Sequence, residues 1–247
     1  MDDNFSTMPS VVAEGRRVIN NLERTGSLFL TKTFFAMFIS FVFFFVSLAT
    51  KGSYKYPFST NNLLLWEVFG IGLSAFFIAL EPDSKPIKKG FMRQILKNAV
   101  PYAVLMVVST FICFLLLIFQ EKGAFYTGVD AFGFDALNSG EPRYGATAIA
   151  VIANSALALF VLFMTCRPLN VYRGLVVGGA SLASVITVIV CIFKHGKNVL
   201  HVNFDKLNAE NYIALAAIVI VLAAATLLIN TLYGVLKKDK KEVKHEN

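Results

Sequence analysis

The sequence predicts an all-α membrane protein with six transmembrane helices. Of its 247 residues, 56% are hydrophobic and only 16% are charged, and the mean hydropathy is +0.63. A soluble domain carries about 25% charged residues, so this composition excludes an ordinary soluble fold. Six apolar segments approach the roughly 20 residues that a helix needs to cross a bilayer. They are residues 28–49, 63–80, 99–119, 146–165, 174–193 and 212–236.

These segments favour helices over the strands of a membrane barrel. Each segment is apolar without a regular break, whereas a barrel strand alternates between apolar and polar residues over about 10 positions. Turn-forming residues separate the segments, as at Lys51-Gly52-Ser53 and Gly140-Glu141-Pro142. The small-residue runs 174–179 and 214–225 are expected to permit close packing between helices.

The polar residues 1–27 are predicted to form a stalk that leads into the first membrane helix. Asn4 or Ser6 is a candidate N-cap for a helix that continues through Arg17 and Arg24 into the apolar segment. No basic and apolar run typical of a secretory signal precedes the first span. The chain therefore divides into a stalk (1–27), a six-helix membrane domain (28–236) and a basic tail (237–247).

The basic residues predict which side of the membrane each loop faces. Six crossings place both termini on one side, and cytoplasmic loops are enriched in Lys and Arg. The segments on the side of the termini hold 15 of the 23 Lys and Arg residues: Arg16, Arg17, Arg24, Lys85, Lys88, Lys89, Arg93, Lys97, Arg167, Arg173, Lys237, Lys238, Lys240, Lys241 and Lys244. Both termini are therefore expected in the cytoplasm.

The cysteines and the net charge exclude two other classes of protein. Cys113, Cys166 and Cys191 stand singly, without the paired spacing of a zinc site or a disulfide framework. The net charge of +7 does not indicate nucleic-acid binding, because the basic residues cluster at the ends of apolar segments. The lipid bilayer is the expected partner, and no nucleic acid is expected.

Two sequence blocks resemble P-type cation-transporting ATPases. Asp2 to Thr7, followed by Val11 to Asn21, is similar to the segment that leaves the phosphorylation domain of these pumps and becomes their fifth membrane helix. Asn62 to Trp66 and Gly72 to Pro82 resemble their sixth membrane helix and its cytoplasmic exit. The resemblance implies that the six predicted helices correspond to the last six membrane helices of a bacterial pump.

The chain lacks the motifs that these pumps use for phosphoryl transfer. Neither Asp-Lys-Thr-Gly, which carries the phosphorylated aspartate, nor the magnesium-binding loop Gly-Asp-Gly-x-Asn-Asp occurs in the sequence. Phosphoryl transfer needs a carboxylate, a metal ion and a phosphate cradle together. We therefore expect no catalytic residue, no nucleotide site and no cofactor in this chain; ATP and magnesium are expected only for a complete pump.

Two ionisable residues lie inside the predicted spans, Lys32 in the first and Glu67 in the second. Charged groups in a bilayer are costly and are usually functional. Each residue also lies about one turn from the end of its span, so the alternative is that both side chains extend to the membrane interface. A further hypothesis is that Lys32 serves as a counter-charge, neutralising Glu67 when no ion is bound.

The resemblance adds two ion-binding candidates and argues against a complete calcium site. It places Thr33 and Glu67 where calcium pumps carry ion-binding asparagines, and Asn154 near a polar ligand of the eighth helix. It also places Ala36 and Gly70-Ile71 where calcium pumps have further ligands. An alignment anchored on the tryptophan before Glu67 would remove the correspondence of Glu67. The cation is left open, with divalent ions among the alternatives.

The sequence thus predicts the ion-translocating membrane part of an ATP-driven cation pump, in the plasma membrane as a multi-pass protein. Its expected partners are the transported cation and the missing N-terminal portion of the pump. Two alternatives stay open: a short membrane protein that binds or regulates a separately encoded pump half, and a non-functional truncated remnant. The sequence leaves the oligomeric state undetermined.

Overall fold

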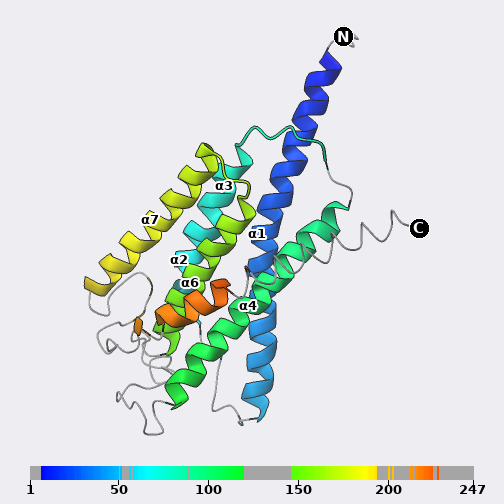
Figure 1. Ribbon diagram of the computed structural model, residues 1–247. Helices are drawn as coiled ribbons and strands as arrows, with labels where there is room; N and C mark the ends of the chain where they lie inside the picture. The colour runs from blue at the N-terminus through cyan, green and yellow to red at the C-terminus, as the bar shows by residue number, and fades with distance from the viewer. Residues whose placement is uncertain are drawn as a thin grey trace, which may run out of the picture.

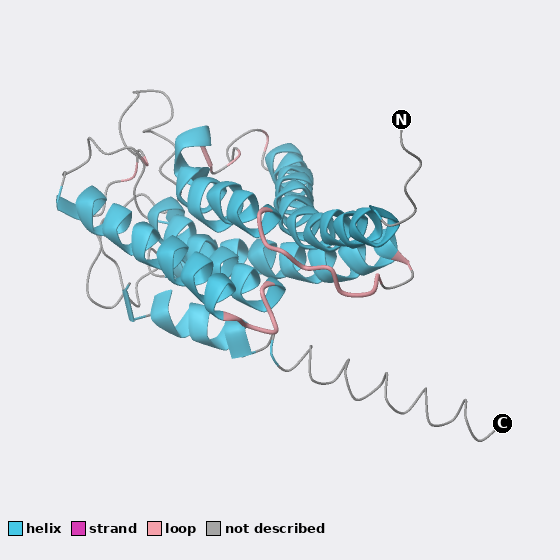
Figure 2. Cartoon of the chain, turned by 90° about the horizontal axis from the view of Figure 1, so that it is seen from above, coloured by secondary structure: helices cyan, strands magenta, loops and turns pink. Residues whose placement is uncertain are grey.

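The computed structural model describes residues 7–49, 51, 56, 58–87, 90–119, 146–193, 200, 202, 212, 213, 215–224 and 227. Their regular elements are helices, packed side by side in one bundle from which the first helix projects at one end (Figure 1). The view along the perpendicular direction shows the same bundle, with the loop after the second span lying across its end (Figure 2). We call the end from which the first helix projects the stalk end.

Helix α1 (Met8–Ala49) joins the stalk to the first membrane span without a break. Its 42 residues correspond to about 63 Å at 1.5 Å per residue, which is about twice the thickness of the hydrocarbon core. Only the second half of α1 is apolar enough to lie in a bilayer. The first half therefore forms the projecting stalk.

The second span is divided into three helical pieces: α2 (Thr60–Leu65), the π-helix η2 (Trp66–Gly72) and α3 (Leu73–Ala79). Glycines at positions 70 and 72 weaken the preference of this stretch for a regular α-helix. A Cβ atom on Gly70 would lie 3.2 Å from the Cβ of Ala158, so glycine allows the π-helix to lie close against α6. Short π-helices often occur at functional sites.

Helices α4 (Phe91–Phe119), α6 (Ala146–Thr165) and α7 (Val171–Phe193) complete the described bundle. The core lies between α1, α4, α6 and η2, with Phe35 packed edge-to-face on Trp66 at 5.2 Å between ring centroids. Fully buried aliphatic side chains, among them Met106 of α4 and Leu157 of α6, fill the rest. Tight packing of this kind holds membrane helices together, because lipid supplies no hydrophobic driving force between them.

The structure confirms an all-helical membrane architecture for most of the predicted spans. Among the described residues, five helices are long and apolar enough to cross a bilayer, and they coincide with the first five predicted segments. The third helix begins at Phe91, whereas the predicted segment began at residue 99. Its first turns contain polar residues, so a search for apolar sequence did not include them. Of the predicted sixth span, the structure describes a continuous helix over Leu215–Ala224, which is shorter than a full crossing. The count of six and the orientation of the termini therefore stay predictions.

Candidate functional site

Lys32 of α1 and Glu67 of η2, on two helices able to cross a bilayer, form an ion pair with 2.8 Å between Nζ and Oε1. Their side chains are 37% and 26% exposed, so the pair lies at the margin of the described bundle and not in its core. Pairing brings two charges of opposite sign together, which reduces the cost of placing either one in hydrocarbon. Among the candidate residues, the structure brings these two into contact.

The π-helix sets the position of Glu67. The backbone N–H of Leu73 donates to the carbonyl oxygen of Val68, five residues earlier, which is the pattern of a π-helix. A Cβ atom on Gly72 would lie 3.1 Å from the carbonyl oxygen of Glu67, so glycine leaves room for that carbonyl. The acidic side chain thus lies on a stretch of non-standard backbone.

The other two ion-binding candidates, Asn154 and Thr33, make hydrogen bonds to other residues. Asn154 is buried between α6 and α4, and its Nδ2 donates to Thr110 Oγ1 at 2.8 Å. Its Oδ1 has no hydrogen-bond partner among the described residues, and it is therefore an oxygen available to a ligand. Thr33 lies on the exposed face of α1, where its hydroxyl donates to the carbonyl oxygen of Phe29.

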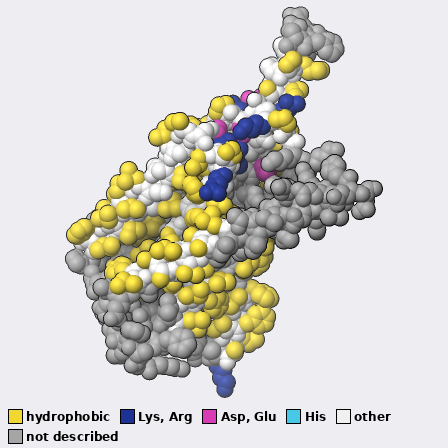
Figure 3. All heavy atoms as spheres, in the orientation of Figure 1, with side chains coloured by type: hydrophobic (Ala, Val, Ile, Leu, Met, Phe, Trp, Pro, Cys, Tyr) yellow, Lys and Arg dark blue, Asp and Glu magenta, His cyan; other side chains and the backbone are white. Residues whose placement is uncertain are grey.

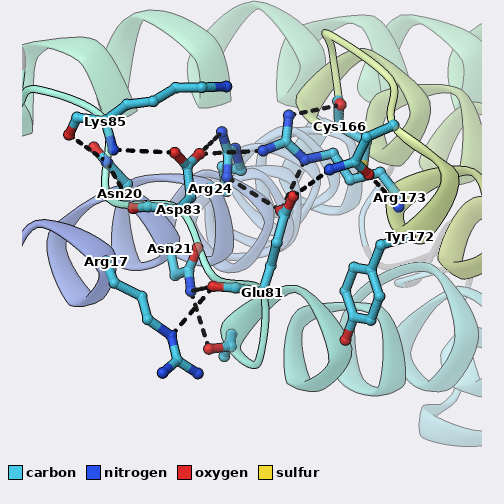
Figure 4. Close-up of polar contacts among 12 residues, drawn as sticks. Arg17, Asn20, Asn21, Arg24, Glu81, Asp83, Lys85, Cys166, Tyr172 and Arg173 are labelled. Carbon is cyan, nitrogen blue, oxygen red and sulfur yellow. Dashed lines mark hydrogen bonds and ion pairs between the residues drawn. The ribbon is translucent and has the colours of Figure 1, made fainter. Parts of the chain in front are cut away.

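A second polar group, which we call the stalk-end cluster, consists of Arg24, Glu81, Asp83 and Arg173 (Figure 4), together with Asn170. Arg173 Nε lies 2.8 Å from Glu81 Oε2, and its Nη2 lies 3.1 Å from Asp83 Oδ2. Arg24 reaches the same two carboxylates, at 2.6 Å from Asp83 Oδ2 and 3.4 Å from Glu81 Oε2. Asn170 Nδ2 donates to Glu81 Oε1 at 2.7 Å.

This cluster is buried and balanced in charge. The side chains of Glu81 and Asp83 are each 4% exposed and that of Arg173 is 2% exposed, while Arg24 is 17% exposed. Two carboxylates face two guanidinium groups, so the burial leaves no excess charge among these four residues. Such an arrangement is tolerated because each charge keeps partners of opposite sign.

The stalk also binds the backbone of residues 80–87, which follow α3 and which we call the exit segment. Asn21 Nδ2 donates to the carbonyl oxygens of Ala79 and Glu81, and Arg17 donates to those of Leu80 and Glu81. Asn20 Nδ2 donates to the carbonyl oxygens of Asp83 and Lys85. The last carbonyls of a helix lack partners within the helix, and here the stalk side chains supply partners at the end of α3.

The spacing along α1 explains why one helix can make all these contacts. Residues 17, 20, 21 and 24 follow the i, i+3, i+4, i+7 pattern, which places them on one helix face. From the sequence, these positions were interpreted as motif residues or as markers of topology, and their contacts with Glu81, Asp83 and the backbone around them were missed. Figure 3 shows basic side chains gathered near the base of the projecting stalk, while hydrophobic side chains cover much of the bundle.

Two pKa values are shifted at the stalk end, those of Asp83 and Cys166. Burial of Asp83 disfavours its charged form, but the hydrogen bond and positive charge of Arg24, together with the backbone N–H of Lys85, outweigh that effect and lower the pKa of Asp83. Cys166 lies beside the cluster and is buried, and this burial raises the pKa of its thiol to about 11. Asp83 is thus ionised and Cys166 protonated at neutral pH.

Within the described ranges, no group of three or more His, Cys, Asp or Glu side chains is placed to hold a metal ion. The candidate ligands named from the sequence supply the side-chain oxygens of Glu67, Asn154 and Thr33. Calcium takes six to eight oxygen ligands, so these three side chains alone would not complete a calcium site.

Comparison with known proteins identifies relatives of this chain. No model of a known protein family matches it. It is 31% identical over 190 residues to the calcium-transporting ATPase CtpE of Mycolicibacterium smegmatis, an alignment that covers 75% of this chain and 22% of the relative. The CtpE protein of Mycobacterium tuberculosis matches to the same extent. The probable cation-transporting ATPase exp7 of Streptococcus pneumoniae is 26% identical over 111 residues, covering 44% of this chain and 14% of the relative.

The chain spans about a fifth of the length of the two CtpE proteins, 22% in each case. The part of the chain that the structure describes holds five helices able to cross a bilayer. Over three quarters of its own length, this chain is a homologue of the P-type cation-transporting ATPases.

Proposed function

We propose that this chain is the ion-translocating part of an ATP-driven cation pump, acting with a further part that binds ATP and magnesium. The named activities of its relatives support this role, as does the small share of their length that it covers. We also propose that the stalk end is cytoplasmic and that the protein resides in the plasma membrane. The basic residues near the stalk end support that orientation.

The observation that carries the proposal is the ion pair between Lys32 and Glu67. In the ion-bound state, the Glu67 carboxylate binds the transported cation. In the ion-free state, the Lys32 ammonium group replaces that cation, so the carboxylate never faces hydrocarbon without a positive partner. Asn154 Oδ1 and the Thr33 hydroxyl are the further candidate ligands, with backbone, water or the other part of the pump supplying the rest.

The continuous helix α1 connects this pair to the stalk. Lys32 lies eight residues beyond Arg24, which is about 12 Å along a helix. A displacement of the stalk that is carried along α1 therefore moves Lys32 relative to Glu67 on η2. That movement would alternately offer and withdraw the ammonium group as the pump cycles.

The test is cation-stimulated ATP hydrolysis by this chain co-expressed with the remaining portion of a CtpE-type pump. Calcium is tested first because of the names of the relatives, followed by magnesium, manganese, sodium and potassium. We expect Glu67→Gln to abolish stimulation and Lys32→Met to change the cation concentration needed for it. Lys51→Met is the matched control, since Lys51 follows α1 outside the spans.

The outcomes separate the alternatives. If no cation stimulates hydrolysis in the combined protein, the pump assignment is wrong. If stimulation occurs but the Glu67 and Lys32 variants behave like Lys51→Met, the pump assignment stands and the ion site is wrong. If the chain changes the activity of a pump that is already complete without it, the protein is a regulator.

A further inference from the structure

The stalk-end cluster connects three segments that are far apart in the sequence. Arg24 belongs to α1, the two carboxylates belong to the exit segment, and Arg173 belongs to the first turn of α7. Glu81 and Asp83 each contact both arginines. Each carboxylate is therefore shared between the stalk and α7, and neither arginine holds the exit segment alone.

These side-chain contacts add to the hydrogen bonds by which Arg17, Asn20 and Asn21 hold the backbone of the exit segment. Residues 82–87 form no regular helix, yet the side chains of Glu81 and Asp83 are almost fully buried. If one arginine is lost, both carboxylates stay buried with half of their positive partners, which is strongly unfavourable. The contacts on the two sides should therefore form and break together.

We propose that the stalk-end cluster is a lock that holds α1, the exit segment and α7 in a single arrangement and opens as a unit. On the side of α7, Arg173 holds the carboxylates of Glu81 and Asp83 in position. A role for this lock in transport, in which it transmits movement of the stalk to α3 and η2, rests on the proposed function. The lock itself rests only on the contacts of this chain.

Cys166 is a natural reporter for opening of the lock. It is fully buried, and Arg173 Nη1 donates to its backbone carbonyl at 3.4 Å and to that of Pro168 at 2.7 Å. A thiol reagent reaches a buried cysteine only when the surrounding structure opens locally. The labelling rate of Cys166 therefore measures how often this region opens.

The experiment uses the full chain in detergent micelles, with Cys113→Ala and Cys191→Ala so that Cys166 is the remaining thiol. A small charged methanethiosulfonate reagent labels the parent chain and the variants Arg24→Gln, Arg173→Gln and their combination. We expect each single substitution to raise the labelling rate by about tenfold or more, and the double substitution to add much less than the product of the two.

The matched control is Arg167→Gln. The Arg167 guanidinium lies 4.9 Å over the ring of Phe163, near the same turn and outside the cluster, so its loss should leave the rate unchanged. A companion chain that keeps only Cys113, buried in α4, reports opening of the bundle as a whole. Arg173→Lys, which retains a positive charge, provides a milder variant if Arg173→Gln does not fold.

Three results would overturn the lock. Labelling that responds to Arg173 but not to Arg24 would show a local contact of α7 only. Effects of the two single substitutions that multiply in the double variant would show two independent contacts. An equal rise in Cys113 labelling would show that the whole bundle opens. The assay contains neither ATP nor a transported ion, so its result is independent of the pump assignment.

Discussion

The ion pair between Lys32 and Glu67 can be tested by a double-mutant cycle on the free energy of unfolding. The variants are Lys32→Met, Glu67→Gln and the double substitution, which replace each charge by a side chain of similar length. At 2.8 Å, two unit charges attract by about 6 kcal/mol if the effective dielectric constant is about 20. Desolvation and the flexibility of the lysine side chain offset most of this gross attraction.

The exposed fractions of the two side chains limit the range in which the coupling energy is expected. Fully exposed ion pairs contribute about 0.2–1 kcal/mol, whereas breaking a buried pair costs about 3–5 kcal/mol. With Lys32 37% exposed and Glu67 26% exposed, we expect a value between these cases, about 1–2 kcal/mol. Each single substitution leaves one charge without its partner, so it should destabilise the chain more than the double substitution does.

The assay is reversible unfolding of the four proteins in mixed micelles, followed by circular dichroism at neutral pH. A coupling energy near zero would refute the reasoning, because it would mean that each charge is solvated independently at the membrane interface. Lys51→Met serves as the control for removal of a lysine outside the spans. The cycle measures the pair without any assumption about the transported cation.

Three further predictions concern other contacts. Gly70→Ala should destabilise the bundle by about 1–3 kcal/mol, because the new methyl group would lie 3.2 Å from Ala158 Cβ. Adding Ala158→Gly should restore part of the lost stability in the same unfolding assay. Asn62→Leu should cost about 1–3 kcal/mol, because it removes a buried 2.7 Å hydrogen bond to the carbonyl oxygen of Leu200; unchanged stability would contradict this. The pKa of Asp83 in the folded protein lies below its ordinary value of 3.8. Its contribution to the free energy of unfolding should therefore be complete above about pH 5 and decline as the pH falls below 3.8. Asp83→Asn should remove that part of the pH dependence.

The membrane helices could be predicted because a bilayer imposes a simple rule on sequence. A span needs about 20 apolar residues, and five of the six segments identified in this way coincide with long helices. Lys32 and Glu67 were found for the same reason, since a charge stands out in an apolar segment. Their contact is visible only in the structure, and their role in ion binding is still a prediction.

The stalk-end cluster could not be predicted, because its partners are distant in the sequence. Arg24 and Glu81 are 57 residues apart, and Glu81 and Arg173 are 92 residues apart. A single sequence shows the sign of each charge but not what it faces. The arginines were therefore interpreted as markers of topology, which explains their side of the membrane but not their burial.

The glycines illustrate the same limit. The run 174–179 was expected to allow close packing, but a Cβ atom on Gly174, Gly178 or Gly179 would meet nothing within 4 Å. Gly70 instead makes the close approach, against Ala158. Small residues permit contact between helices, and the arrangement of the helices decides which of them are used.

The unbroken course of α1 makes the protein sensitive to helical register. A slip of the stalk by one residue turns a helix by about 100° and advances it by about 1.5 Å. Because one continuous helix runs from Met8 to Ala49, such a rotation of the stalk would also move Lys32 and swing its ammonium group away from Glu67. A rotation of the stalk about its own axis would therefore also break the ion pair between Lys32 and Glu67.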